Sequence, residues 1–225
     1  MSDAAPAPDL AAANSDDLGR TLMRVAWLSI LLGILIQLVL LVAGLAQGAQ
    51  PSWVSQLADT AKSVSWATLV CVGVAVGRAI PGARTVNMGL LGLLSGPMAF
   101  NVAKVVHRGV GESLKVAPAT AAVIVLPAAT MGLIKALEYG GLGALIGWVS
   151  RRSWGRLGAH AGTGLAVGLV FGGLVYYLTN QLSMEINGQP LAMARALPIF
   201  INETVFPMGC AVVLYTTDSI RRRMG

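Results

Sequence analysis

The sequence has few charged residues and few cysteines. Only 12% of its 225 residues are Asp, Glu, Lys or Arg, about half the share that soluble domains carry. The two cysteines, Cys71 and Cys210, lie far apart within apolar segments, where they are best interpreted as small buried hydrophobic residues. These shortages argue against a soluble fold and against redox chemistry based on thiols.

Motifs for catalysis and for metal binding are also missing. The sequence contains no Walker loop, no GxSxG turn, no HExxH helix and no acidic metal-binding motif of lipid-phosphate transferases. Its two histidines, His107 and His160, stand apart from each other at predicted membrane boundaries. We therefore expect a protein that is not an enzyme and that holds neither a cofactor nor a metal ion.

Apolar residues and glycine are abundant. Hydrophobic residues make up 55% of the chain, which also contains 27 glycines, and the mean hydropathy is +0.70. This composition predicts an all-α, polytopic helical membrane protein. Residues 1–19 are rich in Ala, Pro, Asp and Ser and are expected to form a disordered cytoplasmic tail. Residues 20–220 are then the six-helix transmembrane domain, and 221–225 form a basic cytoplasmic end.

Six apolar segments are long enough to cross a bilayer, which takes about 20 helical residues. They cover residues 25–45, 64–80, 86–106, 117–150, 158–179 and 196–216. The fourth segment would be about 50 Å long as one helix at 1.5 Å per residue, against a hydrocarbon core of about 30 Å. Pro127 and the glycine-rich run 139–143 allow either one long broken helix or a half-span followed by a full span.

The basic residues favour one orientation in the membrane. With six spans and the N-terminus inside, ten arginines lie on the inner side: Arg20, Arg24, Arg78, Arg84, Arg151, Arg152, Arg156 and Arg221 to Arg223. Five basic residues then lie on the outer side: Lys62, Lys104, Arg108, Lys115 and Arg195. The positive-inside rule therefore predicts a multi-pass protein of the cell inner membrane with both termini cytoplasmic.

Apart from Arg78 at the exit of the second span and His160 at the boundary of the fifth, four Lys and Glu residues fall inside the predicted spans. Each such charge costs roughly 2.5–3.5 kcal/mol at the centre of the bilayer. Lys104 and Glu203 are expected at the same depth, in the outer third. There Glu203 would either bind an ion or proton or act as the counter-ion of Lys104, and a Lys–Glu pair of this kind could also simply hold two helices together. Lys135 and Glu138 join this layer if the fourth span covers 131–150, and lie near the inner surface if it covers 117–138. With two neighbouring amides, the candidate substrate- or ion-binding residues are Glu203, Lys104, Asn101, Asn202, Lys135 and Glu138.

Prolines and glycines suggest how the helices are shaped and packed. Pro207 lies four residues after Glu203, so its ring is expected to kink the helix and free the carbonyl of Glu203. Glycines recur at four-residue spacing, as at Gly73 and Gly77 or Gly143 and Gly147. This spacing lets helix backbones approach closely in lipid, and it is interpreted as close packing rather than as a dimer face.

These patterns predict a transporter-like protein or permease subunit for a small solute or ion, with a polar cavity in the outer third of the bilayer. The alternative is a non-catalytic structural or accessory subunit of a membrane complex. Expected partners are the lipid bilayer, a small solute or ion, and other membrane subunits or a second copy, but no nucleic acid. In length and hydropathy alone, the outline resembles the small membrane-embedded substrate-binding subunits of energy-coupling vitamin transporters.

Overall fold

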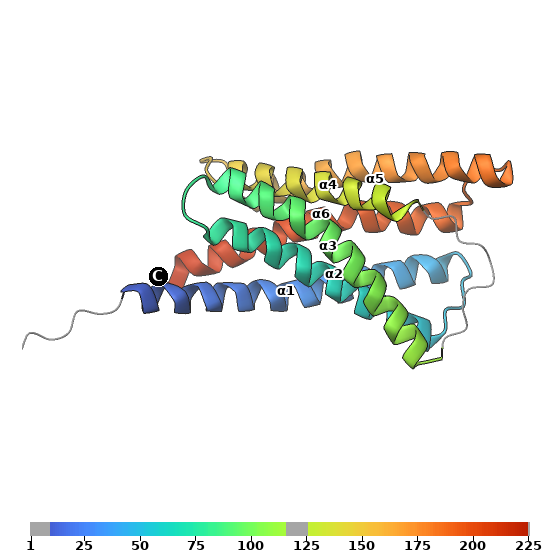
Figure 1. Cartoon of the computed structure of the whole chain (residues 1–225), viewed down its shortest axis with the longest axis horizontal. Helices are drawn as coiled ribbons and strands as arrows, with labels where there is room; N and C mark the ends of the chain where they lie inside the picture. The colour runs from blue at the N-terminus through green and yellow to red at the C-terminus, as the bar shows by residue number, and fades with distance from the viewer. Residues whose placement is uncertain (1–9, 116–125, 225) are drawn as a thin grey trace, which may run out of the picture.

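Six α-helices, arranged side by side, make up the part of the protein that the structure describes (Figure 1). The computed structural model describes residues 10–115 and 126–224, and within these ranges all regular secondary structure is helical. The helices are α1 (Leu10–Ala46), α2 (Trp53–Ala79), α3 (Arg84–Ser113), α4 (Ala128–Val149), α5 (Leu157–Asn187) and α6 (Met193–Met224). The prediction of an all-α fold is confirmed.

Five of these helices are long and apolar enough to cross a membrane: all except α4, which carries Lys135 and Glu138. The outer surface of α1 supports a lipid environment, since Trp27, Leu31 and Leu35 are 63%, 60% and 59% exposed. These residues recur at four-residue spacing and form one apolar face. The chain therefore has the architecture of a multi-pass helical membrane protein.

The fourth segment forms a helix only from Ala128 onward. Pro127 immediately precedes α4, a place that suits proline because a residue at a helix start needs no intrahelical N–H bond. The helix then continues through Gly140 to Gly143 without a break, so a helix broken at this glycine run is wrong. Lys135 lies two turns after the start of α4. Most of the predicted segment before Pro127, residues 117–125, lies outside the described part of the chain.

Both end helices extend beyond the predicted spans. The first helix, α1, begins at Leu10, so residues 10–19, expected in a disordered tail, are helical. Alanine, which has the highest helix propensity, occupies positions 11–13. The last helix, α6, continues through Pro198 and Pro207 to Met224, so the arginines expected in a basic end belong to it.

Glycines bring neighbouring helices into backbone contact. A Cβ atom added at Gly92 or Gly143 would overlap the facing backbone, at Tyr139 and Met88 respectively, so α3 and α4 touch. The same holds between α5 and α6, where Gly164 faces Pro207. The four-residue glycine spacing therefore serves packing within the chain, as predicted.

The apolar core lies in the middle of the bundle. It includes Val70, Met88, Tyr139, Leu142 and Phe206 from α2, α3, α4 and α6. Cys71 and Cys210 belong to the same cluster and are both unpaired and fully buried, which confirms their interpretation as small core residues.

An arginine cluster around Asp218 joins three helices at one end of the bundle. Asp218 on α6 is 5% exposed and forms an ion pair with Arg78 of α2. Its oxygens also lie 2.6 Å from Arg222, 3.6 Å from Arg221 and 3.8 Å from Arg84 at the start of α3. The C-terminus and the α2–α3 and α4–α5 connections share this end of the molecule (Figure 1).

The glycine contacts yield a testable prediction. Gly143→Ala should lower the midpoint of thermal unfolding in detergent by several degrees, because the added methyl group meets the backbone of Met88 and overpacking costs about 1–3 kcal/mol. Gly141 is the matched control, since nothing lies within 4 Å of its Cβ position. Gly141→Ala should raise the midpoint, because alanine favours helices over glycine by about 1 kcal/mol. Shifts of the same sign would contradict the close α3–α4 contact.

Candidate functional site

A buried ion cluster joins α4 to α6. The Nζ atom of Lys135 donates to Oε2 of Glu138 at 2.7 Å, one turn further along α4. It also forms an ion pair with Oε2 of Glu203 on α6. Lys135, Glu138 and Glu203 are 3%, 0% and 6% exposed. We call these three residues the charged triad.

Glycines allow the helices that carry the triad to lie close to their neighbours. The Cβ position of Gly96 on α3 overlaps the backbone of Lys135, which seats α4 against α3. On α5, the Cβ position of Gly172 lies 3.1 Å from the Cβ atom of Glu203, and that of Gly168 lies 3.0 Å from its carbonyl oxygen. A larger residue at Gly96 would displace α4, and one at Gly168 or Gly172 would displace α6. Each of these helices carries part of the triad.

Aromatic rings surround the ammonium group. The Nζ atom of Lys135 lies 5.3 Å from the ring centre of Trp66 and 5.7 Å from that of Tyr139, distances at which cation–π attraction operates. Trp66 in turn contacts the edges of Tyr139 and Phe206, with ring centres 5.8 Å and 6.1 Å apart. These apolar rings keep water away from Lys135 and so strengthen its attraction to the two carboxylates.

The two carboxylates of the triad have more hydrogen-bond acceptor oxygens than the single ammonium group of Lys135 satisfies. With all three groups ionised, two carboxylates face one positive charge. Oε1 of Glu138 is buried without a hydrogen-bond partner. Glu203 accepts its hydrogen bond through Oε2, and among the described residues Oε1 of Glu203 has no partner. A proton, a metal cation or a cationic group of a solute would balance this excess charge.

A cavity with two lobes reaches the triad. The wide lobe has a volume of about 520 Å³ and extends to Ala49 and Pro51 in the α1–α2 connection. The deep lobe has a volume of about 170 Å³ and is lined by Trp66, Lys135 and Phe206, among others. Residues that line both lobes are Lys62, Ser63, Phe100, Met131, Asn202 and Glu203. We call the end of the bundle opposite Asp218 the outer end, as a label only, and the two lobes together the outer-end cavity.

The alternative in which Lys104 is the counter-ion of Glu203 is wrong. Glu203 pairs with Lys135, whereas Lys104 is exposed and places its Nζ atom 5.3 Å from the ring centre of Phe100. The depth estimate put Lys104 and Glu203 in one layer, but it did not specify which helix lies beside α6. Lys104 nevertheless lines the deep lobe, and Asn202 lines both lobes.

Asn101 lies outside the cavity wall. Its side chain is exposed and donates to the carbonyl oxygen of Pro97 at 2.9 Å, one turn back along α3. The face of α3 that lines the cavity carries Phe100, Ala103 and Lys104. Because each residue turns the helix by about 100°, Asn101 projects well to one side of that face. Of the six candidates, the structure therefore brings together Lys135, Glu138, Glu203, Asn202 and Lys104.

Sequence reasoning missed the apolar part of the wall. Trp66, Phe100 and Phe206 line the deep lobe, yet an aromatic residue within an apolar helix carries no signal that it faces a cavity. Lys62 and Ser63 were also missed, since they lie in the polar N-terminal half of α2, just before its apolar segment. A search for polar residues at matching depth on every helix would have found Lys62 and Ser63.

Comparisons with family models, curated proteins and solved structures found no match for this chain. The likeness in outline to the vitamin-transporter subunits thus has no matching family or structure behind it. The site is therefore interpreted from its own geometry.

The triad predicts a strong coupling between Lys135 and Glu203. Lys135→Met leaves two buried carboxylates without a counter-charge and should lower the stability in detergent by about 3–5 kcal/mol. Adding Glu203→Gln should restore part of that loss, giving a coupling energy of at least about 1 kcal/mol in a double-mutant cycle. Lys104→Met is the control and should be nearly neutral alone and additive with Glu203→Gln. Stronger coupling of Glu203 to Lys104 than to Lys135 would contradict the pairing.

Proposed function

We propose that this protein is an integral membrane transporter-like protein or permease subunit for a small solute or ion, and that the outer-end cavity is its binding site. The observation that carries the proposal is Glu203, which belongs to the buried triad and also lines both lobes of the cavity. An ion pair that only joined two helices would have no need of a cavity beside it. Ionisable residues that line a cavity at membrane depth are typical of solute pathways.

The shape of the cavity supports solute binding. Ligand sites are concave and mostly apolar, with a few polar groups that fix the ligand's orientation. The wide lobe, at about 520 Å³, falls within the range of about 300–1,000 Å³ typical of small-molecule pockets. Its apolar walls include Leu40, Leu41 and Val175, and its polar groups include Asn202 and Glu203.

The alternative function, a structural or accessory subunit, draws less support from the structure. In such a subunit, glycine stripes would face helices of another protein. Several of these glycines instead contact helices of the same chain: Gly77 faces α3, Gly92 faces α4, and Gly164 and Gly168 face α6. These glycines therefore pack against helices of the same protein and do not require a partner subunit.

We further propose a location in the cell inner membrane with both termini cytoplasmic. The arginines of the Asp218 cluster lie at the end of the bundle that holds the C-terminus and the start of α1 (Figure 1), and the positive-inside rule assigns this end to the cytoplasm. The outer-end cavity then opens away from the cytoplasm, while Asp218 and its arginines join α2, α3 and α6 at the cytoplasmic end.

This orientation can be tested by thiol labelling in intact cells. Asn202→Cys should react with a membrane-impermeant maleimide added outside, because Asn202 lines both lobes of the cavity. The two native cysteines are fully buried and should stay unlabelled. Ser29→Cys is the matched control, since Ser29 on α1 is 0% exposed. Labelling of position 202 only after the cells are permeabilised would contradict the orientation.

Transport itself can be measured in proteoliposomes. Radiolabelled amino acids, amines and carboxylic acids serve as probes, together with dyes that report fluxes of H⁺, Na⁺ and K⁺. For any probe carried by the native protein, Glu203→Gln and Lys135→Met should each lower the initial rate at least about tenfold, since both alter the charge at the base of the cavity.

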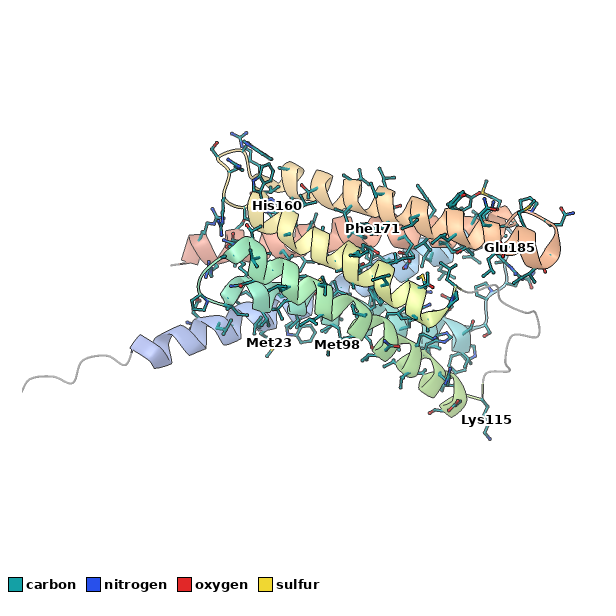
Figure 2. All side chains as sticks on the ribbon, turned by 45° about the horizontal axis from the view of Figure 1, so that its top comes forward. Met23, Met98, Lys115, His160, Phe171 and Glu185 are labelled. Atoms are coloured by element: carbon teal, nitrogen blue, oxygen red, sulfur yellow. The ribbon has the colours of Figure 1, made fainter. Side chains whose placement is uncertain are left out.

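The matched control is Glu185→Gln, at the far end of α5 (Figure 2), where the side chain is exposed. This variant should keep the native rate. Size-exclusion profiles in detergent check that each variant is folded. Native rates in both triad variants, or no flux of any probe in the native protein, would overturn the proposed function.

A further inference from the structure

Two lysines bring unpaired positive charge to the outer-end cavity. Lys62 on α2 and Lys104 on α3 both line the deep lobe, and both are exposed. Among the described residues neither forms an ion pair, and Lys104 has only the ring of Phe100 beside its ammonium group. Asp59 lines the wide lobe but not the deep lobe, and its Oδ1 atom lies 3.2 Å from Nε2 of His107. The exposed part of the deep lobe therefore carries a positive excess.

The base of the same lobe carries the opposite excess. Lys135 and Glu203 line it, and Glu138 lies directly beside Lys135. These three groups sum to one negative charge when ionised. Oε1 of Glu203 has no hydrogen-bond partner among the described residues, so it can accept a bond from a bound ligand. Within one small chamber, the structure thus places a negative base and a positive exposed part.

The remaining wall of the deep lobe is apolar. Trp66, Phe100 and Phe206 supply aromatic surfaces, and Met131 and Ala103 complete the wall. The lobe has a volume of about 170 Å³, below the range of about 300–1,000 Å³ for drug-sized ligands. It therefore suits a ligand that is small and has an apolar body.

From this arrangement, and resting on the proposed function above, we propose that the outer-end cavity binds a small zwitterion. Its ammonium group lies at Glu203, its carboxylate lies toward Lys62 and Lys104, and its apolar body contacts the aromatic wall. A cation without a carboxylate would leave both lysines unpaired. An anion without an ammonium group would meet the excess carboxylate at the base, and an unpaired charge of that kind is costly where water is scarce.

Two matched sets of ligands test the charge requirement directly. The first set is L-phenylalanine, phenethylamine and 3-phenylpropionate; the second is L-leucine, 3-methylbutylamine and 4-methylpentanoate. In each set the body is shared, and only the ammonium or carboxylate group is missing. Binding to the purified full chain is measured by isothermal titration calorimetry in lipid nanodiscs. In at least one set, the zwitterion should bind at least tenfold more tightly than either analogue.

Substitutions then assign each end of the ligand. Lys62→Gln combined with Lys104→Gln should weaken zwitterion binding about tenfold or more, and should leave amine binding unchanged. Glu203→Gln should weaken zwitterion and amine binding without weakening carboxylate binding. Lys115→Gln is the control: Lys115 is an exposed lysine just beyond the end of α3, outside the cavity wall (Figure 2). The Lys115→Gln variant should bind each of the six ligands with the same affinity as the native protein.

Several results would overturn the inference. One is a single-charge analogue that binds as tightly as the zwitterion, or more tightly, in both sets. A second is that none of the six ligands binds. A third is an unchanged zwitterion affinity in the variant that carries both lysine substitutions. A different result would overturn the proposed function: no flux of any probe in proteoliposomes that contain the native protein. A native protein that carries only cations, with a rate that depends on Glu203, would keep the proposed function and overturn the zwitterion.

Discussion

The buried ammonium group of Lys135 is the interaction on which the site depends. It offsets one of the two negative charges of Glu138 and Glu203, and it links α4, which packs on α3, to α6, which packs on α5. Such a pair is a weak source of stability, because an apolar substitute of similar volume is often as good. Removing one partner is costly, since the remaining charge stays buried. The triad therefore joins the two helix pairs, and it does so beside a cavity.

The helices were predictable from the sequence and the lateral order of the helices was not. Apolar segments, charge asymmetry and glycine spacing are local signals, and they predicted six helices with close packing through glycine. They also marked Lys135, Glu138 and Glu203 as unusual, because ionisable residues are rare in apolar segments. Depth along a helix follows from counting residues, but hydropathy does not say which helix lies beside which. For that reason Lys104 was paired with Glu203, although α4 supplies the partner.

Other parts of the site gave no local signal at all. Trp66 and Phe206 are ordinary residues for apolar helices, and only the fold shows that the ring of Trp66 lies beside Lys135 and that Phe206 packs on Trp66. Asp218 was also unmarked, because a single carboxylate beside three arginines at a helix end looks like an ordinary surface charge. The structure shows that it is 5% exposed and reaches Arg78 and Arg84 on two other helices. Both cases depend on contacts between residues far apart in the sequence.

The two charged clusters give α6 two different kinds of anchor. At the end with the arginines, Asp218 contacts α2 and α3 through several guanidinium groups at once. At the cavity, α6 is held to α4 through one ammonium group and one oxygen of Glu203. A ligand changes a conformation only if it interacts differently with the two states. A ligand ammonium group bound at Oε1 of Glu203 would share this carboxylate with Lys135. Ligand binding would therefore act on the anchor at the cavity and not directly on the anchor at Asp218.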